Sequence, residues 1–385
     1  MDLLLVTPEY PPYGSGIANA VHKIVNHLSK HGVVTMVVSR RGGDINISTL
    51  FDNLPGIFGL IPFWQRAIKY AIEMMDTYDA LWLHSPLLLD VKGLYSLSKT
   101  KTIIMTFHST YWGFYNACKE NAITHLTLYY FLASKIERLF LKKISLIDNL
   151  IITSVSPAIS QELIENDLSK LKTPYVVPNG LEEEFRINID RLEARGILRE
   201  RYGLEFSQDD QLLIYVGRVT EIKQPLLLVE MFEQINVVKP NTHLLIVGSG
   251  NLLKKIRRKQ EKIKNLHVMG HIPHKDVPIF LRASNAFISL SCYEGLPLSV
   301  LEAASLGLPL ILSDIHAHRW IVSLIKGIKG RAILLDPHKP DPTRVLTFLN
   351  VLEKETSTCD LFPIPTRDFS WKNIINLYLS LLRVT

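Results

Sequence analysis

Glu294 and Glu302 stand on either side of the start of a predicted helix, and their carboxylates could accept hydrogen bonds from sugar or ribose hydroxyl groups. Gly295 would let a ligand approach the backbone closely. Pro297 suits the first position of the helix expected over 297–306. Free N–H groups at such a helix start favour an anion such as phosphate. The alternative is a pair of ordinary surface glutamates.

A second loop could bind the phosphate itself. Arg218 and Lys223 follow the apolar run 211–216, which is typical of a buried strand. The Arg218 guanidinium could grip phosphate oxygens with two parallel bonds, and Lys223 would add a point charge. A solvated loop, in which Glu221 pairs with either base, is the alternative.

Two glycine-containing loops resemble a dinucleotide fingerprint only in part. Gly14 and Gly16 precede a predicted helix, but Asn19 occupies the third glycine position. The loop 248–250 fails in the same way, because Leu253 stands at its third position. A nicotinamide-dependent oxidoreductase is therefore not favoured, although Gly16 and Gly248 could still admit a ligand to the backbone.

Histidines also follow predicted strands. His108 ends the run 102–107 and could hydrogen-bond a substrate, with His84 as a weaker candidate. His316 and His318 have a possible metal spacing without further ligands, so we interpret them as structural or solvent-facing. We expect no metal site, and the three separated cysteines, Cys118, Cys292 and Cys359, form no zinc or disulfide pattern.

The net charge of +6 comes from one segment. Residues 254–264 carry seven bases and one acid, which equals the whole excess, so a nucleic-acid-binding surface is not indicated. We expect a helix over 252–264 that is either solvated or attracted to anionic lipid headgroups. The basic, aromatic stretch 129–143 could likewise meet a membrane or an acceptor, or be an ordinary amphipathic helix.

No signal peptide or apolar span of about 18 residues is evident. We therefore expect a cytoplasmic protein, with possible peripheral membrane contact on the cytoplasmic face.

These loops are positioned by alternating strands and helices, a pattern that predicts parallel sheets covered on both faces. The pattern runs to about residue 180 and restarts near 211, so the expected domains are 1–180 and 181–365, followed by a helix within 366–385. In such sheets ligands bind where the strands end. The expected strands and helices are 3–7, 17–30, 33–39, 80–84, 102–107, 150–154, 211–216, 225–238, 243–247, 252–264, 266–269, 277–284, 286–289, 297–306, 309–312 and 370–382.

Taken together and in order, these motifs resemble the retaining glycosyltransferases of the GT-B fold, in particular the GT4 family, or glycosyl transferases group 1. The matching features are the first loop, His108, 155–156, 177–181, 217–223, 247–250, Glu294 with Glu302, and 369–371. The resemblance implies two tandem Rossmann-like domains facing a central cleft. It also implies a C-terminal helix that crosses back onto the N-terminal domain.

The resemblance further implies a hexosyltransferase-type enzyme with a nucleotide-diphosphate sugar as donor and no required cofactor. It places Arg218 and Lys223 on the diphosphate, and Glu302 on the ribose. Glu294, with the backbone of Gly295 and Leu296, would contact the transferred sugar. His108 and the Gly16 loop would come from the N-terminal, acceptor-side domain. Residues 44–75 and 110–145 would contribute to a glycan, lipid-linked or small-molecule acceptor site.

Two loops depart from the family pattern. Ser15-Gly16 stands where a glycine pair is common, and the run 315–320 replaces a Gly-Gly and a later glutamate. These departures keep open a non-catalytic GT-B partner that binds nucleotide without turnover. A sugar-nucleotide epimerase is a further alternative. A phosphorylase would need a phosphate or pyridoxal-phosphate site that the sequence does not indicate.

Overall fold

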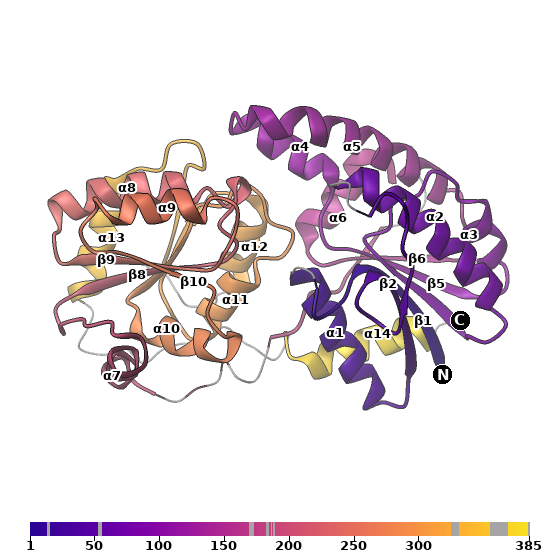
Figure 1. The fold of residues 1–385 in the computed structure, drawn as a ribbon, viewed down its shortest axis with the longest axis horizontal. Coiled ribbons are helices and arrows are strands. Elements are labelled where there is room, and N and C mark those ends of the chain that lie inside the picture. The colour runs from indigo at the N-terminus through magenta and orange to yellow at the C-terminus, as the bar shows by residue number, and fades with distance from the viewer. Residues whose placement is uncertain are drawn as a thin grey trace. The chain divides into compact units, whose positions relative to one another are not determined.

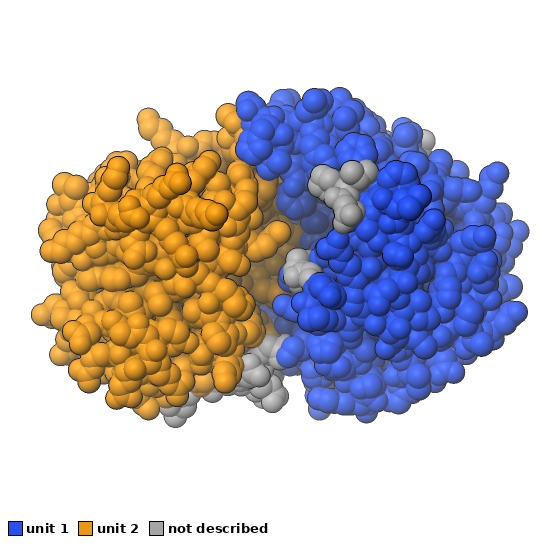
Figure 2. Space-filling view, in the orientation of Figure 1, with its two compact units in different colours: residues 1–119, 124–180, 367–385 blue, residues 120–123, 181–366 orange. Residues whose placement is uncertain are grey.

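The computed structural model describes residues 1–13, 16–52, 56–168, 173–181, 185, 187, 189–324, 331–354 and 369–383. The chain divides into two compact units, which Figure 2 shows in different colours. The first unit comprises residues 1–119, 124–180 and 367–385, and the second comprises 120–123 and 181–366. Each unit contains its own parallel sheet.

The sheet of the first unit is doubly wound, with the strand order β3-β2-β1-β4-β5-β6-β7. All of its strand pairs are parallel. The central strands read as continuous apolar runs because both of their faces are covered. The strands are β1 Asp2–Glu9, β2 Val34–Arg41, β3 Ile45–Asn46, β4 Ala80–His84, β5 Thr102–Phe107, β6 Leu150–Ser154 and β7 Tyr175–Val176.

Helices cover both faces of this sheet (Figure 1). One face packs against α1 and the C-terminal α14, whose Trp371, Ile374 and Tyr378 join the same buried cluster as Leu3 and Trp82. The predicted return of the last helix to the N-terminal half is therefore confirmed. The helices are α1 Gly16–Ser29, α2 Ile57–Met74, α3 Lys92–Leu97, α4 Tyr111–Glu120, α5 Thr124–Ile144, α6 Pro157–Leu163 and α14 Trp371–Arg383.

The sheet of the second unit has the order β10-β9-β8-β11-β12-β13, again with parallel pairs only. Its strands are β8 Gln211–Val216, β9 Thr242–Val247, β10 Leu266–Gly270, β11 Ala286–Ser289, β12 Leu310–Ser313 and β13 Ala332–Leu335. Its helices are α7 Arg191–Tyr202, α8 Pro225–Val238, α9 Leu253–Gln260, α10 Val277–Ala283, α11 Leu298–Ser305, α12 His316–Leu324 and α13 Pro342–Lys354. The predicted fold class, two tandem Rossmann-like domains, is confirmed, whereas the cleft between them stays a prediction.

In both sheets the order in which the chain adds its strands reverses at the same point. The chain builds outward from β1 to β3 and then returns to add β4 on the other side of β1, and β8 and β11 repeat this arrangement. A crevice for ligands forms at the carboxyl ends of the strands at such a switch point. The loops after β8 and β11 are therefore neighbours in the second unit.

Several predicted helix boundaries differ from the observed ones, and the largest difference is in the basic helix. The basic helix ends at Gln260 rather than at 264, and Asn265, in a left-handed conformation (φ 65°), directly precedes β10. The helix expected to start at Pro297 starts at Leu298, and Pro297 is its N-cap residue. Within the described ranges, no helix is long and apolar enough to cross a membrane.

Candidate functional site

The loops after β8 and β11 are joined through their backbones. The N–H of Cys292 donates to the carbonyl oxygen of Ile222 at 2.9 Å, and the Tyr215 hydroxyl donates to the carbonyl of Arg218 at 2.6 Å. These bonds hold the residues 217–223 against the start of the loop that carries Glu294. The two loops at the switch point are thus fixed to each other, and together they position the charged side chains that they carry.

An ion pair lies inside this frame. Lys223 Nζ is 2.5 Å from Glu294 Oε2, and the two side chains are only 14% and 12% exposed. Burial raises the pKa of Glu294, but the Lys223 ammonium, with smaller effects from His318 and Ser291, brings that pKa below its ordinary value. Glu294 is therefore a carboxylate at neutral pH and a hydrogen-bond acceptor only.

The alternative pairing with Glu221 is wrong for Lys223. The Glu221 carboxylate instead accepts hydrogen bonds from Asn251 Nδ2, at 2.9 and 3.0 Å. Arg218 is exposed and forms no ion pair within the described part of the chain. Its guanidinium is thus available to an anion beside the Lys223–Glu294 pair.

Backbone packing requires the two glycines of the loop after β9, Gly248 and Gly250. Gly248 has a φ of 136°, and a β-carbon there would overlap the carbonyl oxygen of Gly217. A β-carbon on Gly250 would likewise overlap the carbonyl oxygen of Val219. The Val219 N–H donates to the Ser249 carbonyl at 2.9 Å, so the two loops pack backbone to backbone. Gly248 therefore supports the Arg218 loop, and its contact with a donor stays a prediction.

The start of α11 completes this edge of the sheet. Gly295 and Leu296 are half-buried between Glu294 and Pro297, and the N–H groups of Val300 and Leu301 bond back to the Pro297 carbonyl. Glu302 projects from the second turn of α11, with Oε1 3.6 Å from His274 Nε2. Its side chain is 13% exposed, so this carboxylate is sheltered as a hydroxyl acceptor should be.

His318, which the sequence indicated as structural or solvent-facing, is a buried group behind Glu294. His318 is fully buried, and its Nδ1 lies 2.8 Å from the Ser313 carbonyl oxygen, which makes Nδ1 the donor. Ser313 Oγ in turn donates to the Ser291 carbonyl at 2.5 Å. Burial lowers the pKa of His318, against the attraction of Glu294, so the ring is neutral. Its place after the end of β12 was the signal that could have identified it. His316 is exposed.

In the first unit, the carboxyl edge of the sheet brings two predicted histidines together. His84 Nδ1 lies 3.0 Å from His108 Nε2, and the rings stack with centroids 5.3 Å apart. Burial lowers the pKa of His108 to about 4, and burial together with the neighbouring His108 lowers the pKa of His84 well below its ordinary value. Both rings are therefore neutral at pH 7, and one donates its N–H to the other.

The first loop is described only from Gly16, where α1 begins, since Gly14 and Ser15 lie outside the described residues. A β-carbon on Gly16 would meet no atom within 4 Å. Packing thus does not require glycine there.

The candidate residues fall into two groups, and each group belongs to one unit. The carboxyl edge of the sheet in the second unit carries Arg218, Lys223, Gly248, Glu302 and the run 294–296. His108 and Gly16 lie at the carboxyl edge of the other sheet, in the first unit. No three His, Cys, Asp or Glu side chains among the described residues gather closely enough to hold a metal ion.

Comparison with known proteins matches these loops to a family model. Residues 197–341, which include all the site residues of the second unit, match the model for glycosyl transferases group 1. A UDP-Gal:alpha-D-GlcNAc-diphosphoundecaprenol alpha-1,3-galactosyltransferase from Escherichia coli is 33% identical over 154 residues, which is 38% of each chain. The chain thus spans about two-fifths of that relative's length.

Two similarities cover more of the chain. An alpha-monoglucosyldiacylglycerol synthase from Streptococcus pneumoniae is 22% identical over 88% of this chain and 76% of its own length. The solved structure of a sucrose-phosphate synthase from Thermosynechococcus elongatus superposes over 100% of both chains, with a TM-score of 0.73 and 16% identity. The chain therefore has the GT-B fold, and its residues 197–341 match the glycosyl transferases group 1 family.

Proposed function

We propose that this chain is a retaining glycosyltransferase that moves a hexose from a nucleotide-diphosphate sugar to an acceptor. The observation that carries the proposal is the sheltered Lys223–Glu294 pair at the switch point, beside an exposed Arg218 and the start of α11. Cations and helix N–H groups at one edge suit a diphosphate, while acceptor-only carboxylates suit hydroxyl groups.

Each residue then has a role in the proposal. Arg218 and Lys223 bind the diphosphate, Glu302 accepts from the ribose hydroxyls, and Glu294, with the backbone of Gly295 and Leu296, orients the transferred sugar. Gly248 lies under the Arg218 loop and lines the donor site. The first unit supplies His108 and the Gly16 loop on the acceptor side.

The chemistry breaks the bond between the anomeric carbon and a phosphate oxygen and forms one from that carbon to an acceptor oxygen. Negative charge grows on the leaving diphosphate, where fixed cations stabilise it. The acceptor's proton passes to that diphosphate if attack occurs on the same face, which retains the anomeric configuration. The neutral His108 can orient a hydroxyl group by a hydrogen bond, but does not supply a positive charge. The absence of a required metal or cofactor is part of the proposal.

The relatives favour a lipid-linked acceptor among the glycan, lipid-linked and small-molecule classes. One relative's name specifies a diphosphoundecaprenol substrate, and the other is a glucosyldiacylglycerol synthase. A cytoplasmic location with peripheral contact to an anionic membrane fits such an acceptor.

A donor panel tests the proposal. The purified chain is incubated with UDP-, GDP- and ADP-sugars and lipid-linked or sugar acceptors, and the product linkage is determined by NMR. We expect transfer from one donor with retention, and a loss of 10-fold or more in Arg218→Ala and Glu294→Ala. Arg199→Ala, an exposed arginine on α7, is the matched control and should behave as wild type. Nucleotide binding without turnover would instead identify a non-catalytic partner, and an altered free sugar nucleotide would identify an epimerase.

A further inference from the structure

Arg40, near the carboxyl end of β2, carries a sheltered guanidinium with an unused donor. Its side chain is 11% exposed. Its Nε is buried and has no hydrogen-bond partner in the described part of the chain. Its Nη2 lies 3.6 Å from Glu9 Oε1, which is an ion pair but is longer than a hydrogen bond. Since a buried donor without an acceptor is costly, a ligand that supplies an acceptor would gain affinity there.

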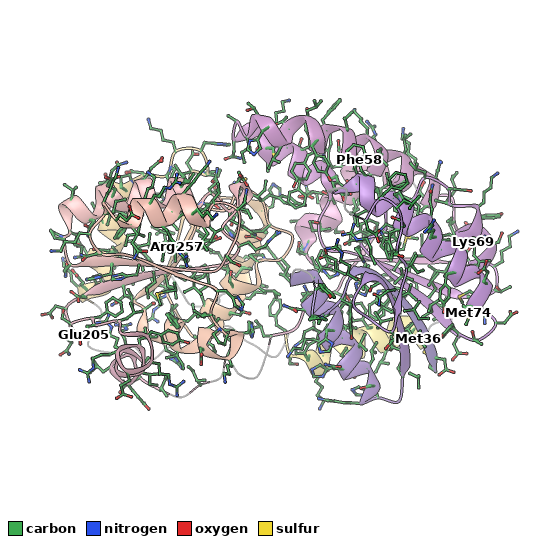
Figure 3. The ribbon with its side chains drawn as sticks, viewed as in Figure 1. Met36, Phe58, Lys69, Met74, Glu205 and Arg257 are labelled. Carbon is green, nitrogen blue, oxygen red and sulfur yellow. The ribbon has the colours of Figure 1, made fainter. Side chains whose placement is uncertain are left out.

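The alternation of side chains along β2 determines which face of the sheet Arg40 occupies. Val37 joins the buried cluster that α1 and α14 form on one face. Residues 36, 38 and 40 therefore face the opposite side. Figure 3 labels Met36, which precedes Arg40 on this strand by four residues. On this side α2 packs against β1 and β2, and α2 lies within the stretch 44–75 that we expect to contribute to the acceptor site.

The acids that follow β2 are bonded to the backbone nearby. Asp44 Oδ2 accepts from the Val37 N–H at 2.8 Å. Asp52 accepts from the N–H and the hydroxyl of Thr49, at 3.0 and 2.8 Å. Among the described carboxylates, only that of Glu9 lies within ion-pair distance of Arg40. The Glu9 side chain is 34% exposed, so it can turn into solvent when another anion takes its place.

The backbone fixes the end of β2 to the loop that follows β1. The Tyr10 N–H donates to the Arg41 carbonyl at 2.9 Å. A β-carbon on Gly42 would overlap the Tyr10 carbonyl oxygen, so the two segments pack without a gap. Arg40 therefore has a fixed place at the carboxyl edge of the first sheet, where His108 also lies. Ligands of such sheets bind at this edge.

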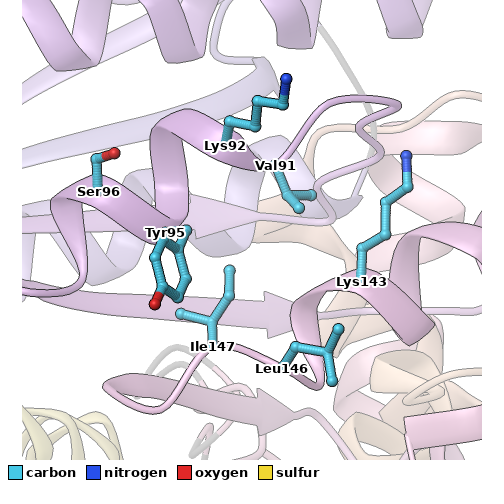
Figure 4. A pocket seen from close by; sticks show the side chains of 7 residues that line it. All are labelled: Val91, Lys92, Tyr95, Ser96, Lys143, Leu146 and Ile147. Carbon is cyan, nitrogen blue, oxygen red and sulfur yellow. The ribbon is translucent and has the colours of Figure 1, made fainter.

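A pocket between α3 and the end of α5 differs from the surroundings of Arg40. It has a volume of ≈ 390 Å³ and apolar walls that include Tyr95 and Ile147. Figure 4 shows that its two cations, Lys92 and Lys143, extend away from these walls. Lys143 Nζ donates to the Leu89 carbonyl. The lining of this pocket thus presents no buried charge that would select a ligand.

We propose that Arg40 binds a phosphate group of the ligand that the first unit recognises. The phosphate replaces Glu9 beside Nη2 and accepts hydrogen bonds from Nη2 and Nε, which are two parallel donors of one guanidinium. Glu9 then turns into solvent. Under the proposed function this ligand is the acceptor, and the inference rests on that function for the name of the ligand alone. The donor diphosphate has its own cations, Arg218 and Lys223, in the second unit.

An NMR titration tests this assignment. The chain is first saturated with the nucleoside diphosphate that it binds (UDP, GDP or ADP), and glucose 1-phosphate, inorganic phosphate or glucose is then added. We expect one equivalent of glucose 1-phosphate to bind more tightly than inorganic phosphate, and glucose to bind at least 10-fold more weakly than glucose 1-phosphate.

Three variants locate the phosphate. Arg40→Gln should lose 10-fold or more in affinity for glucose 1-phosphate. Glu9→Gln should gain about two- to fivefold, because the competing carboxylate is gone. Arg41→Gln is the matched control, since Arg41 is exposed and its side chain projects from the other face of β2. It should retain the wild-type affinity.

Affinity for the nucleoside diphosphate separates this inference from the proposed function. Arg40→Gln should keep that affinity and the urea midpoint of the wild type. If its urea midpoint falls, Arg40→Lys takes its place and should lose about threefold in affinity for glucose 1-phosphate, because an ammonium lacks the parallel donors. A chain that binds no nucleoside diphosphate would contradict the proposed function, and the titration without nucleotide would still test Arg40.

Four results would overturn the proposal. They are unchanged binding of glucose 1-phosphate in Arg40→Gln, weaker binding in Glu9→Gln, loss of nucleoside diphosphate affinity in Arg40→Gln, and equal affinity for inorganic phosphate and glucose 1-phosphate. The third result would place Arg40 on the donor, and the fourth would identify free phosphate as the ligand instead of a phosphorylated acceptor.

Discussion

Lys223 Nζ and Glu294 Oε2 lie 2.5 Å apart although their residues come from loops that follow two different strands, β8 and β11. Both side chains are largely buried. The two groups therefore act as one unit, in which the Lys223 ammonium keeps the Glu294 carboxylate ionised. A bound diphosphate would pair with the Lys223 ammonium, while the Glu294 carboxylate accepts a hydrogen bond from a hydroxyl group.

Breaking this pair from one side should destabilise the fold. Lys223→Met would leave a buried carboxylate without its cation, at a cost of about 3–5 kcal/mol in the free energy of unfolding. Adding Glu294→Gln should recover part of that loss, because no unpaired charge then remains. Urea denaturation of the two single variants and the double variant gives the coupling energy, and strictly additive losses would contradict the pairing.

The same pair predicts a dependence on pH. Since Lys223 holds the pKa of Glu294 below its ordinary value of 4.5, the stabilisation is complete above that value and is lost as the pH falls through the lower, folded value. The stability difference between wild type and Lys223→Met should thus be large at pH 7 and shrink as the pH falls toward the folded pKa of Glu294 in the wild type. A difference that stays constant down to the lowest measurable pH would show that Glu294 contributes no charge to the pair.

Arg218 offers a contrasting test because it is exposed and stabilises little. Arg218→Ala should weaken binding of the nucleotide diphosphate by about 1.5–3 kcal/mol, while the urea midpoint stays within error of wild type. Arg218→Lys should restore only part of the affinity, since an ammonium lacks the two-pronged geometry of a guanidinium. Isothermal titration calorimetry measures both, and unchanged affinity in Arg218→Ala would remove this residue from the donor site.

Much of the site could be predicted because ligands bind at the carboxyl ends of the strands in sheets of this kind. Continuous apolar runs identified β4, β5, β6, β8 and β11 with their observed bounds, and the residues just after β8 and β11 include Arg218, Lys223 and Glu294. The pairing of Lys223 could not be predicted, because Glu221 is nearer in sequence and only the tertiary structure turns it toward Asn251. The sequence indicated His318 only as structural or solvent-facing, because burial, not residue type, makes it part of the site.

The two glycines Gly248 and Gly16 should respond differently to the same substitution. Gly248→Ala combines an unfavourable φ of 136° with an overlap on the Gly217 carbonyl, so we expect a loss of about 1–3 kcal/mol or more in stability. Gly16→Ala meets open space and should leave stability unchanged. Thermal unfolding compares them. If Gly16→Ala keeps its stability but loses transfer, then that loop contacts substrate, whereas a stable Gly248→Ala would contradict the backbone packing of the two loops.

The His84–His108 pair predicts acid sensitivity with a defined sign. Both rings stay neutral in the folded chain because burial lowers their pKa values, that of His108 to about 4, whereas the unfolded chain binds protons near the ordinary value of 6.5. Between these values the unfolded state holds more protons, so stability falls as the pH falls. The slope approaches 1.4 kcal/mol per pH unit for each group.

His84→Gln/His108→Gln can keep the hydrogen bond but cannot titrate, so its unfolding free energy should fall less between pH 6.5 and 5. The exposed His338→Gln is the matched control and should keep the wild-type slope. Equal slopes in all three chains would show that the pair is protonated in the folded state and would favour a charged role for His108.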